Sequence, residues 1–128
     1  MRLLLDTHAL LWWWANDPQL SEAARAAMLD ESNEVHVSAA SAWEIATKQR
    51  IGKLPMWPMP SGGFNELVAA DGFVHLPVGA THAWRAGSLD WAHRDPFDRM
   101  LAAQAMLDRL TLVTRDLAFA DLSITTLW

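Results

Sequence analysis

The sequence predicts an α/β fold in which a parallel sheet is covered by helices on both faces. Short apolar runs that are typical of buried strands alternate with longer segments that carry helix caps and strong helix formers. Crossover helices lie on both faces of a parallel sheet, which explains why its strands are apolar almost throughout. A length of 128 residues suits one domain with a substantial core, so residues 1–128 are assigned to a single domain.

The expected strands differ in the strength of their pattern. Residues 2–5 form an apolar run that ends at Asp6, and residues 34–38 alternate in the way of a half-buried strand. The remaining strands are expected at residues 72–77, 110–114 and 123–127.

Helix starts are marked by their capping residues. Ser21 and Asp95 are N-cap residue types, and Pro96 suits a first helical position because its missing N–H would have no partner there. Ser41 and Glu44 have the spacing of a capping box, which places Ser41 at the N-cap. These signals predict helices at residues 9–14, 21–29, 41–50, 64–70, 81–88 and 96–109, with a loop at residues 54–63.

The first helix is apolar on nearly every side. Trp12, Trp13 and Trp14 cannot all face one core, because successive helical residues point about 100° apart. We therefore expect a partner chain to cover some of these rings.

The composition excludes several classes of protein. Hydrophobic residues make up 52% and charged residues 20% of the chain, which argues against disorder. The absence of cysteine excludes disulfides and thiolate metal sites. No apolar run approaches a signal-peptide core or a membrane span, so a cytoplasmic protein without a membrane partner is expected. A net charge of −5 predicts that any nucleic-acid contact is local.

Two acids follow predicted strands, and two more lie in the helices after the second strand and before the fourth. They are Asp6, Glu44, Asp98 and Asp116. In open α/β sheets, ligands bind outside the carboxyl ends of the strands, so these acids would share one space if their elements meet there. Each could instead serve only as a helix cap. Two carboxylates about 4 Å apart repel by roughly 4 kcal/mol, whereas a helix N-terminus returns only ~0.3–1 kcal/mol. Converging acids would therefore bind a cation or hold protons.

The donor types favour a hard metal ion. The chain has neither cysteine nor a His-x-x-x-His pair, which are typical zinc ligands. Carboxylate oxygens are suited to Mg²⁺ or Mn²⁺ instead. Such ions support phosphate chemistry.

Several stretches, in order along the chain, resemble the PIN-domain ribonucleases, specifically VapC-type toxins of bacterial toxin–antitoxin pairs. The matching stretches are LLLDTHALLWW at residues 3–13, VSAASAWEIATK at 37–48, HRDPFDR at 93–99 and LVTRD at 112–116. The resemblance implies a PIN fold with a five-stranded parallel sheet, RNA cleavage and a Mg²⁺ or Mn²⁺ cofactor.

Matched position by position, the resemblance assigns Asp6, Glu44, Asp98 and Asp116 to the acidic, metal-binding catalytic site. Asp95 is assigned to the helix cap or a supporting position behind the ligands, since Asp98 aligns with the family's ligand.

Other polar residues could support the site or bind substrate. Thr7 and Thr114 stand beside acids and could hydrogen-bond a carboxylate, or could be ordinary strand-end hydroxyls. Arg94 and Arg99 flank the key acids and could seat phosphates. Lys48, Arg50, Lys53 and His93 could also contact phosphate, but a solvated helix end is favoured for the first three and simple exposure for His93. Core or interface packing is favoured for His8, and an apolar helical face for Trp43.

We therefore predict a metal-dependent endoribonuclease that hydrolyses RNA phosphodiesters as the toxin of a toxin–antitoxin pair. The resemblance implies a homodimer and a cognate antitoxin as partners. A haloacid-dehalogenase-type enzyme is set aside, because that family needs a second Asp where this chain has His8. The alternative is a catalytically idle module that regulates through protein or RNA contacts.

Overall fold

The computed structural model confirms the predicted α/β fold. The structure describes residues 1–55 and 62–128, so most of the loop predicted at residues 54–63 lies outside the described residues. The strands form one parallel sheet in the order β3-β2-β1-β4-β5. They are β1 (Arg2–Leu5), β2 (Glu34–Ser38), β3 (Val74–Leu76), β4 (Thr111–Val113) and β5 (Thr126–Leu127). The last strand is shorter than predicted because it pairs only with β4, which has three residues.

Helices fill most of the connections. They are α1 (Thr7–Trp14), α2 (Glu22–Leu29), α3 (Ala39–Arg50), α4 (Gly63–Ala70), α5 (Ala80–Ser88), α6 (Pro96–Asp108) and the 3₁₀ helix η1 (Leu117–Asp121). The predicted caps at Ser21 and Asp95 are confirmed, since each side chain accepts backbone N–H groups of the first turn. None of the helices in the described ranges has both the length and the apolar composition needed to cross a bilayer.

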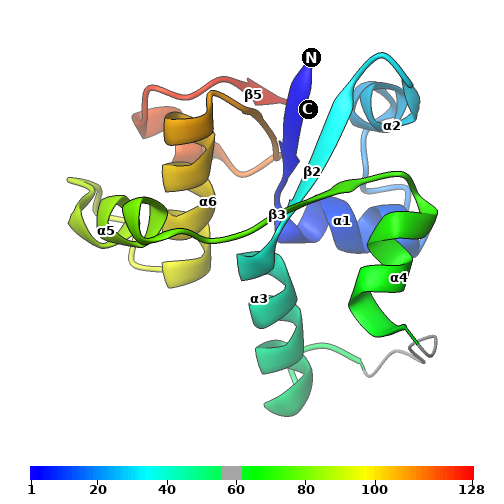
Figure 1. Ribbon diagram of the computed structural model, residues 1–128, viewed down its shortest axis with the longest axis horizontal. Coiled ribbons are helices and arrows are strands. Elements are labelled where there is room, and N and C mark those ends of the chain that lie inside the picture. The colour runs from blue at the N-terminus through cyan, green and yellow to red at the C-terminus, as the bar shows by residue number, and fades with distance from the viewer. Residues whose placement is uncertain (56–61) are drawn as a thin grey trace.

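Two hydrophobic cores lie on opposite faces of the sheet. Leu3 and Leu5 of β1 pack with α1, α2 and α4, whereas Leu4 packs with α6 and η1. Successive strand residues point to opposite faces, so one strand contributes to both cores. Figure 1 shows α1, α2 and α4 on one side of the strands and α5 and α6 on the other.

The chain order places a switch point next to the central strand. From β1 the chain moves outward to β2 and β3, then returns across the sheet to β4 on the other side of β1. Figure 1 shows α3 extending beyond the carboxyl ends of the strands, where α6 also begins. This edge of the sheet is where ligands bind in open α/β folds.

The predicted capping box at the start of α3 is wrong. The helix begins at Ala39, and the N-cap is Ser38, whose hydroxyl accepts the Ala40 N–H at 3.0 Å. The buried end of β2 supplies an equivalent cap earlier, so the helix starts before Ser41. The Ser41 hydroxyl instead accepts a hydrogen bond from Thr7 at 3.0 Å, and Glu44 lies in the second turn with no capping role.

The tryptophans of α1 are partly covered by the chain itself. Trp12, Trp13 and Trp14 are each half-buried, and they pack against different segments. Their ring partners are Trp128, Phe73 and Phe64, with centroid separations of 5.8, 5.7 and 5.6 Å respectively. The chain therefore covers part of each ring, and coverage of the remainder by a partner chain stays a prediction.

Candidate active site

A cavity of about 540 Å³ opens at the carboxyl edge of the sheet. We call it the acidic pocket. Its lining residues are Asp6, Thr7, His8, Trp12, Glu44, Lys48, Asp95, Asp98, Arg115, Asp116 and Leu117. All the acids predicted from the sequence thus reach one space, from β1, α3, α6 and the segment after β4.

Asp6 directly follows β1 and lines the acidic pocket. It is 7% exposed, and its Oδ1 caps α1 by accepting the Ala9 N–H at 2.7 Å. Burial raises the pKa of the Asp6 carboxyl, and the Glu44 charge raises it further. Hydrogen bonds from the Thr114 hydroxyl and Ala9, together with nearby His8, oppose that rise in pKa. The Asp6 side chain thus both caps α1 and lines the acidic pocket.

Glu44 projects from the second turn of α3 and is 3% exposed. Its Oε2 forms an ion pair with the Lys48 ammonium, one helical turn later on the same face. The Thr7–Ser41 hydrogen bond ties α1 to α3 beside this pair. Glu44 is therefore a buried carboxylate whose charge is balanced by its own helix.

Asp98 occupies the first turn of α6. The neighbouring Asp95 caps this helix, its Oδ1 accepting the N–H groups of Phe97 at 2.8 Å and Asp98 at 3.3 Å. The Asp98 Oδ2 lies 2.7 Å from Nε2 of His93. Burial raises the pKa of Asp98 to about 6; the His93 hydrogen bond opposes the rise, while the charges of Asp95 and Glu44 add to it.

Asp116 lies at the exposed side of the pocket. Its Oδ1 caps η1 by accepting the Ala118 N–H at 2.9 Å. Its own N–H donates to the Thr114 hydroxyl at 3.0 Å, and Thr114 is 4% exposed. Thr114 therefore joins the acids that follow β1 and β4.

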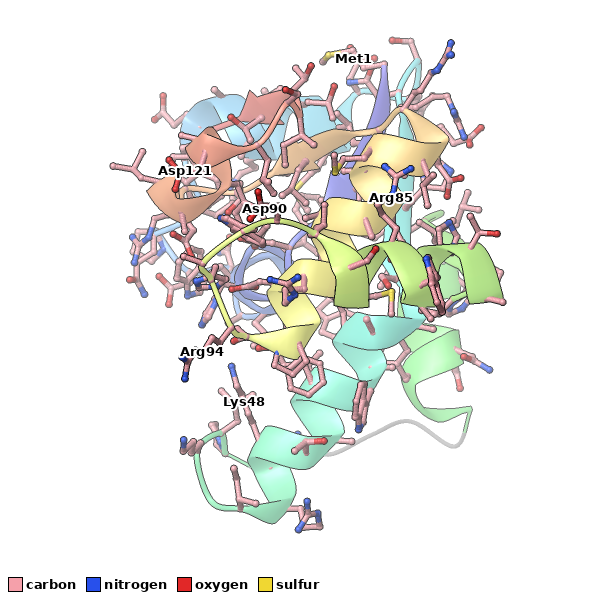
Figure 2. The ribbon with its side chains drawn as sticks, turned by 90° about the vertical axis from the view of Figure 1, so that its left-hand side faces the viewer. Met1, Lys48, Arg85, Asp90, Arg94 and Asp121 are labelled. Carbon is pink, nitrogen blue, oxygen red and sulfur yellow. The ribbon has the colours of Figure 1, made fainter. Side chains whose placement is uncertain are left out.

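The basic residues proposed to contact phosphate separate into distinct groups. The Arg99 guanidinium donates to backbone carbonyls of the segment between α5 and α6, and Arg99 does not line the pocket. The expected phosphate role of Arg99 is therefore replaced by a structural one. Arg94 is exposed, and Figure 2 shows it projecting outward from the segment before α6, on the same side of the molecule as Lys48.

The sequence did not predict the contacts of three basic residues at this site. Lys48 and His93 bond the acids, and Arg115 stacks over Trp12 at 4.4 Å beside the pocket. The i,i+4 spacing of Glu44 and Lys48 was a usable signal. The other contacts join segments distant in sequence, or cross a loop, and carry no spacing signal. By contrast, Arg50 and Lys53 are exposed, as favoured.

The structure places neither His8 nor Trp43 in the core, so core packing of His8 is wrong, whereas its packing at an interface stays a prediction. His8 is exposed and lines the acidic pocket. Trp43 is 60% exposed and packs edge-on against Phe97, with centroids 4.7 Å apart. Both lie on helix faces that the sheet does not cover.

The donor chemistry of the pocket fits a hard divalent cation. It offers carboxylate oxygens, the ligands that Mg²⁺ and Mn²⁺ prefer, and a cavity wide enough for the waters that such ions retain. Within residues 1–55 and 62–128, no three acidic or histidine side chains are already close enough to enclose an ion. Burial and mutual repulsion raise the pKa of Asp6 and Asp98, and a bound cation would offset both effects.

Comparisons with known proteins agree with the geometry. A sequence model of the PIN domain matches residues 3–124. Similar solved structures include VapBC2 from Rickettsia felis bound to a promoter DNA fragment, with a TM-score of 0.66 at 15% identity over 99% of this chain and 98% of that one. FitAcB from Neisseria gonorrhoeae gives 0.63 at 22% identity, covering 100% and 97%. A toxin–antitoxin complex from Klebsiella pneumoniae gives 0.61 at 16% identity, covering 98% and 96%. A search of curated protein sequences finds no match.

Proposed function

This chain belongs to the PIN-domain family, and on that premise we propose that it is a Mg²⁺- or Mn²⁺-dependent endoribonuclease. One observation carries the proposal. Carboxylates from four separate segments line a single pocket at the carboxyl edge of the sheet, and the pKa values of two of them are raised by burial. Burying carboxylates where their ionised form is disfavoured costs folding free energy. Acids with pKa values raised in this way are typical of functional sites.

Asp6, Glu44 and Asp98 would hold the metal, with Asp116 binding directly or through water from the exposed side. A divalent ion in this pocket would supply an activated water and neutralise charge that develops on the phosphate. Hydrogen bonds restrain two of these carboxylates in the absence of a metal ion. Asp6 accepts from Ala9 and Thr114, and Asp98 accepts from His93. Such restraint lowers the cost of assembling the site.

The phosphodiester would enter beside the basic groups on the rim of the pocket. Lys48 and Arg115 line it, and exposed Arg94 precedes α6. These cations would position a negatively charged backbone without reading its sequence. With a net charge of −5, attraction for RNA is confined to this rim.

We further propose that the protein is the toxin of a toxin–antitoxin pair and acts on cytoplasmic RNA. The support is the fold shared with VapBC2, FitAcB and the Klebsiella pneumoniae complex. A cognate antitoxin that covers the acidic pocket and a homodimeric toxin are part of this proposal.

The test is incubation of the purified chain with end-labelled RNA in Mg²⁺, Mn²⁺ or EDTA. Cleavage should require the metal, and Asp6→Asn, Glu44→Gln and Asp98→Asn should each reduce it on the order of 100-fold or more. Asp121→Asn is the matched control, because this exposed acid lies outside the pocket. Circular dichroism should show that all variants are folded.

Full cleavage in EDTA would refute the metal mechanism. Absence of cleavage in every metal, together with RNA binding that survives the three substitutions, would instead support the catalytically idle regulatory module.

A further inference from the structure

We propose that His93 is a positioning residue that fixes the orientation of the Asp98 carboxylate in the acidic pocket. This inference rests on the proposed function and deepens it, since it concerns how one ligand of the proposed metal site is held. The His93 ring has contacts on two sides.

The first contact is the hydrogen bond between His93 and Asp98. The distance from Nε2 to Oδ2 is 2.7 Å, and the two side chains are 29% and 20% exposed. A carboxylate only accepts hydrogen bonds, so Nε2 carries the proton and donates. In the part of the chain that the structure describes, no other group bonds the Asp98 carboxylate. Oδ2 is therefore held by His93, and Oδ1 is left available to the pocket.

The second set of contacts holds the His93 ring. It packs against the Trp91 ring, with centroids 4.8 Å apart and planes inclined by 38°. Trp91 in turn packs against Phe119 at 5.4 Å, and Phe119 is 1% exposed in the core beside β4. The ring that holds Asp98 is thus anchored to the hydrophobic core.

The backbone of His93 is held by Arg99. The guanidinium donates to the carbonyl of His93 at 2.9 Å and to that of Trp91 at 2.8 Å. Further bonds reach the carbonyls of Leu89 at 2.6 Å and Ala86 at 2.8 Å. The planar, multi-donor guanidinium is suited to fixing several carbonyls at once. Arg99 directly follows Asp98, so the ligand and the support of its partner come from one turn of α6.

This arrangement has the form of support behind a metal ligand. A partner that bonds one oxygen of a ligating carboxylate orients the other, and loss of such partners weakens metal binding. In Asp98 the bonded oxygen is Oδ2, which leaves Oδ1 for the pocket.

Two substitutions separate the hydrogen bond from the ring packing. His93→Phe retains a ring against Trp91 and removes the donor, whereas His93→Gln retains an N–H donor and removes the ring. Mn²⁺ affinity is measured by isothermal titration calorimetry on the full chain, with thermal unfolding in EDTA as the second readout. His75→Phe, at an exposed position on β3, is the matched control.

We expect His93→Phe to weaken Mn²⁺ binding about 10-fold or more, while thermal unfolding in EDTA shows that the variant still folds cooperatively. His93→Gln should bind Mn²⁺ within about threefold of the wild-type affinity, and the control His75→Phe should bind Mn²⁺ as tightly as the wild type. Unchanged Mn²⁺ affinity in His93→Phe would overturn the inference, as would equal losses in both His93 variants, since these would indicate a purely structural ring. A wild-type chain that binds no Mn²⁺ would overturn the proposed metal site, and this inference with it.

Discussion

The two halves of the acidic pocket hold their carboxylates by different means. On the strand side, Asp6 and Asp116 follow β1 and β4 and cap the next helices through backbone N–H groups. On the helix side, Glu44 and Asp98 serve no cap and instead bond the basic side chains of Lys48 and His93. A strand-end acid is oriented by the main chain, whereas an acid on a helix face needs a side-chain partner.

The difference also determines where unbalanced charge lies. Asp6 is buried with its pKa raised, and its hydrogen-bond partners are neutral. Glu44 is buried to a similar extent, but it is paired with a cation. A metal ion bound at Asp6 would therefore balance a charge that lacks a cationic partner, whereas at Glu44 it would compete with Lys48.

The largest effect on stability is expected from removing the cation of the helix side. Lys48→Met would leave the buried Glu44 carboxylate unpaired, so the free energy of unfolding in metal-free buffer should fall by about 2 kcal/mol. This is less than for a fully buried pair, because the Lys48 side chain is 27% exposed. Urea unfolding measures the loss.

Lys53→Met is the matched control, since it removes the same charge from an exposed position. Its effect should stay within about 0.5 kcal/mol. Adding Mn²⁺ should stabilise Lys48→Met more than the wild type, because Glu44 is then free to bind. Equal stabilisation of the two would contradict competition between Lys48 and the metal.

A smaller loss is expected on the strand side from Thr114→Val. The buried hydroxyl bonds Asp6 and accepts the Asp116 N–H, and valine preserves its shape. The free energy of unfolding should fall by about 1 kcal/mol, measured by urea unfolding. Thr111→Val at the partly exposed start of β4 provides the control. If both variants were equally stable, Thr114 would not link the two acids.

The smallest effect is a gain in stability with Asp98→Asn. Burial raises the pKa of Asp98 to about 6 in the folded chain, from 3.8. The stability that this proton contributes is fully present below about pH 3.8 and is lost as the pH rises through about 6. At pH 7.5 in metal-free buffer, the variant should therefore unfold roughly 2 °C higher than the wild type.

That advantage of Asp98→Asn should shrink as the pH falls below 4. Asp90→Asn, an exposed substitution, should show no such dependence. Scanning calorimetry across this pH range makes the comparison. A variant less stable than the wild type at pH 7.5 would mean that the carboxylate is not a burden on the fold.

Much of the molecule could be predicted from local patterns. The apolar runs of β1 and β2 and the caps at Ser21 and Asp95 were identified correctly, because they depend on neighbours in sequence. The Ser41 cap failed because an equivalent cap, Ser38, preceded it at the buried end of β2. Where two local signals compete, packing against the sheet decides.

The sequence by itself determined which acids follow each strand and which helices begin beside them, since strand period and capping chemistry act over a few residues. Only the tertiary structure decided that these acids share a pocket and which partners hold them. The Trp91–His93–Asp98 contacts and the Arg99 bonds depend on α5, α6 and η1 packing together. Such contacts cross loops and unite distant segments, so no spacing in the sequence encodes them.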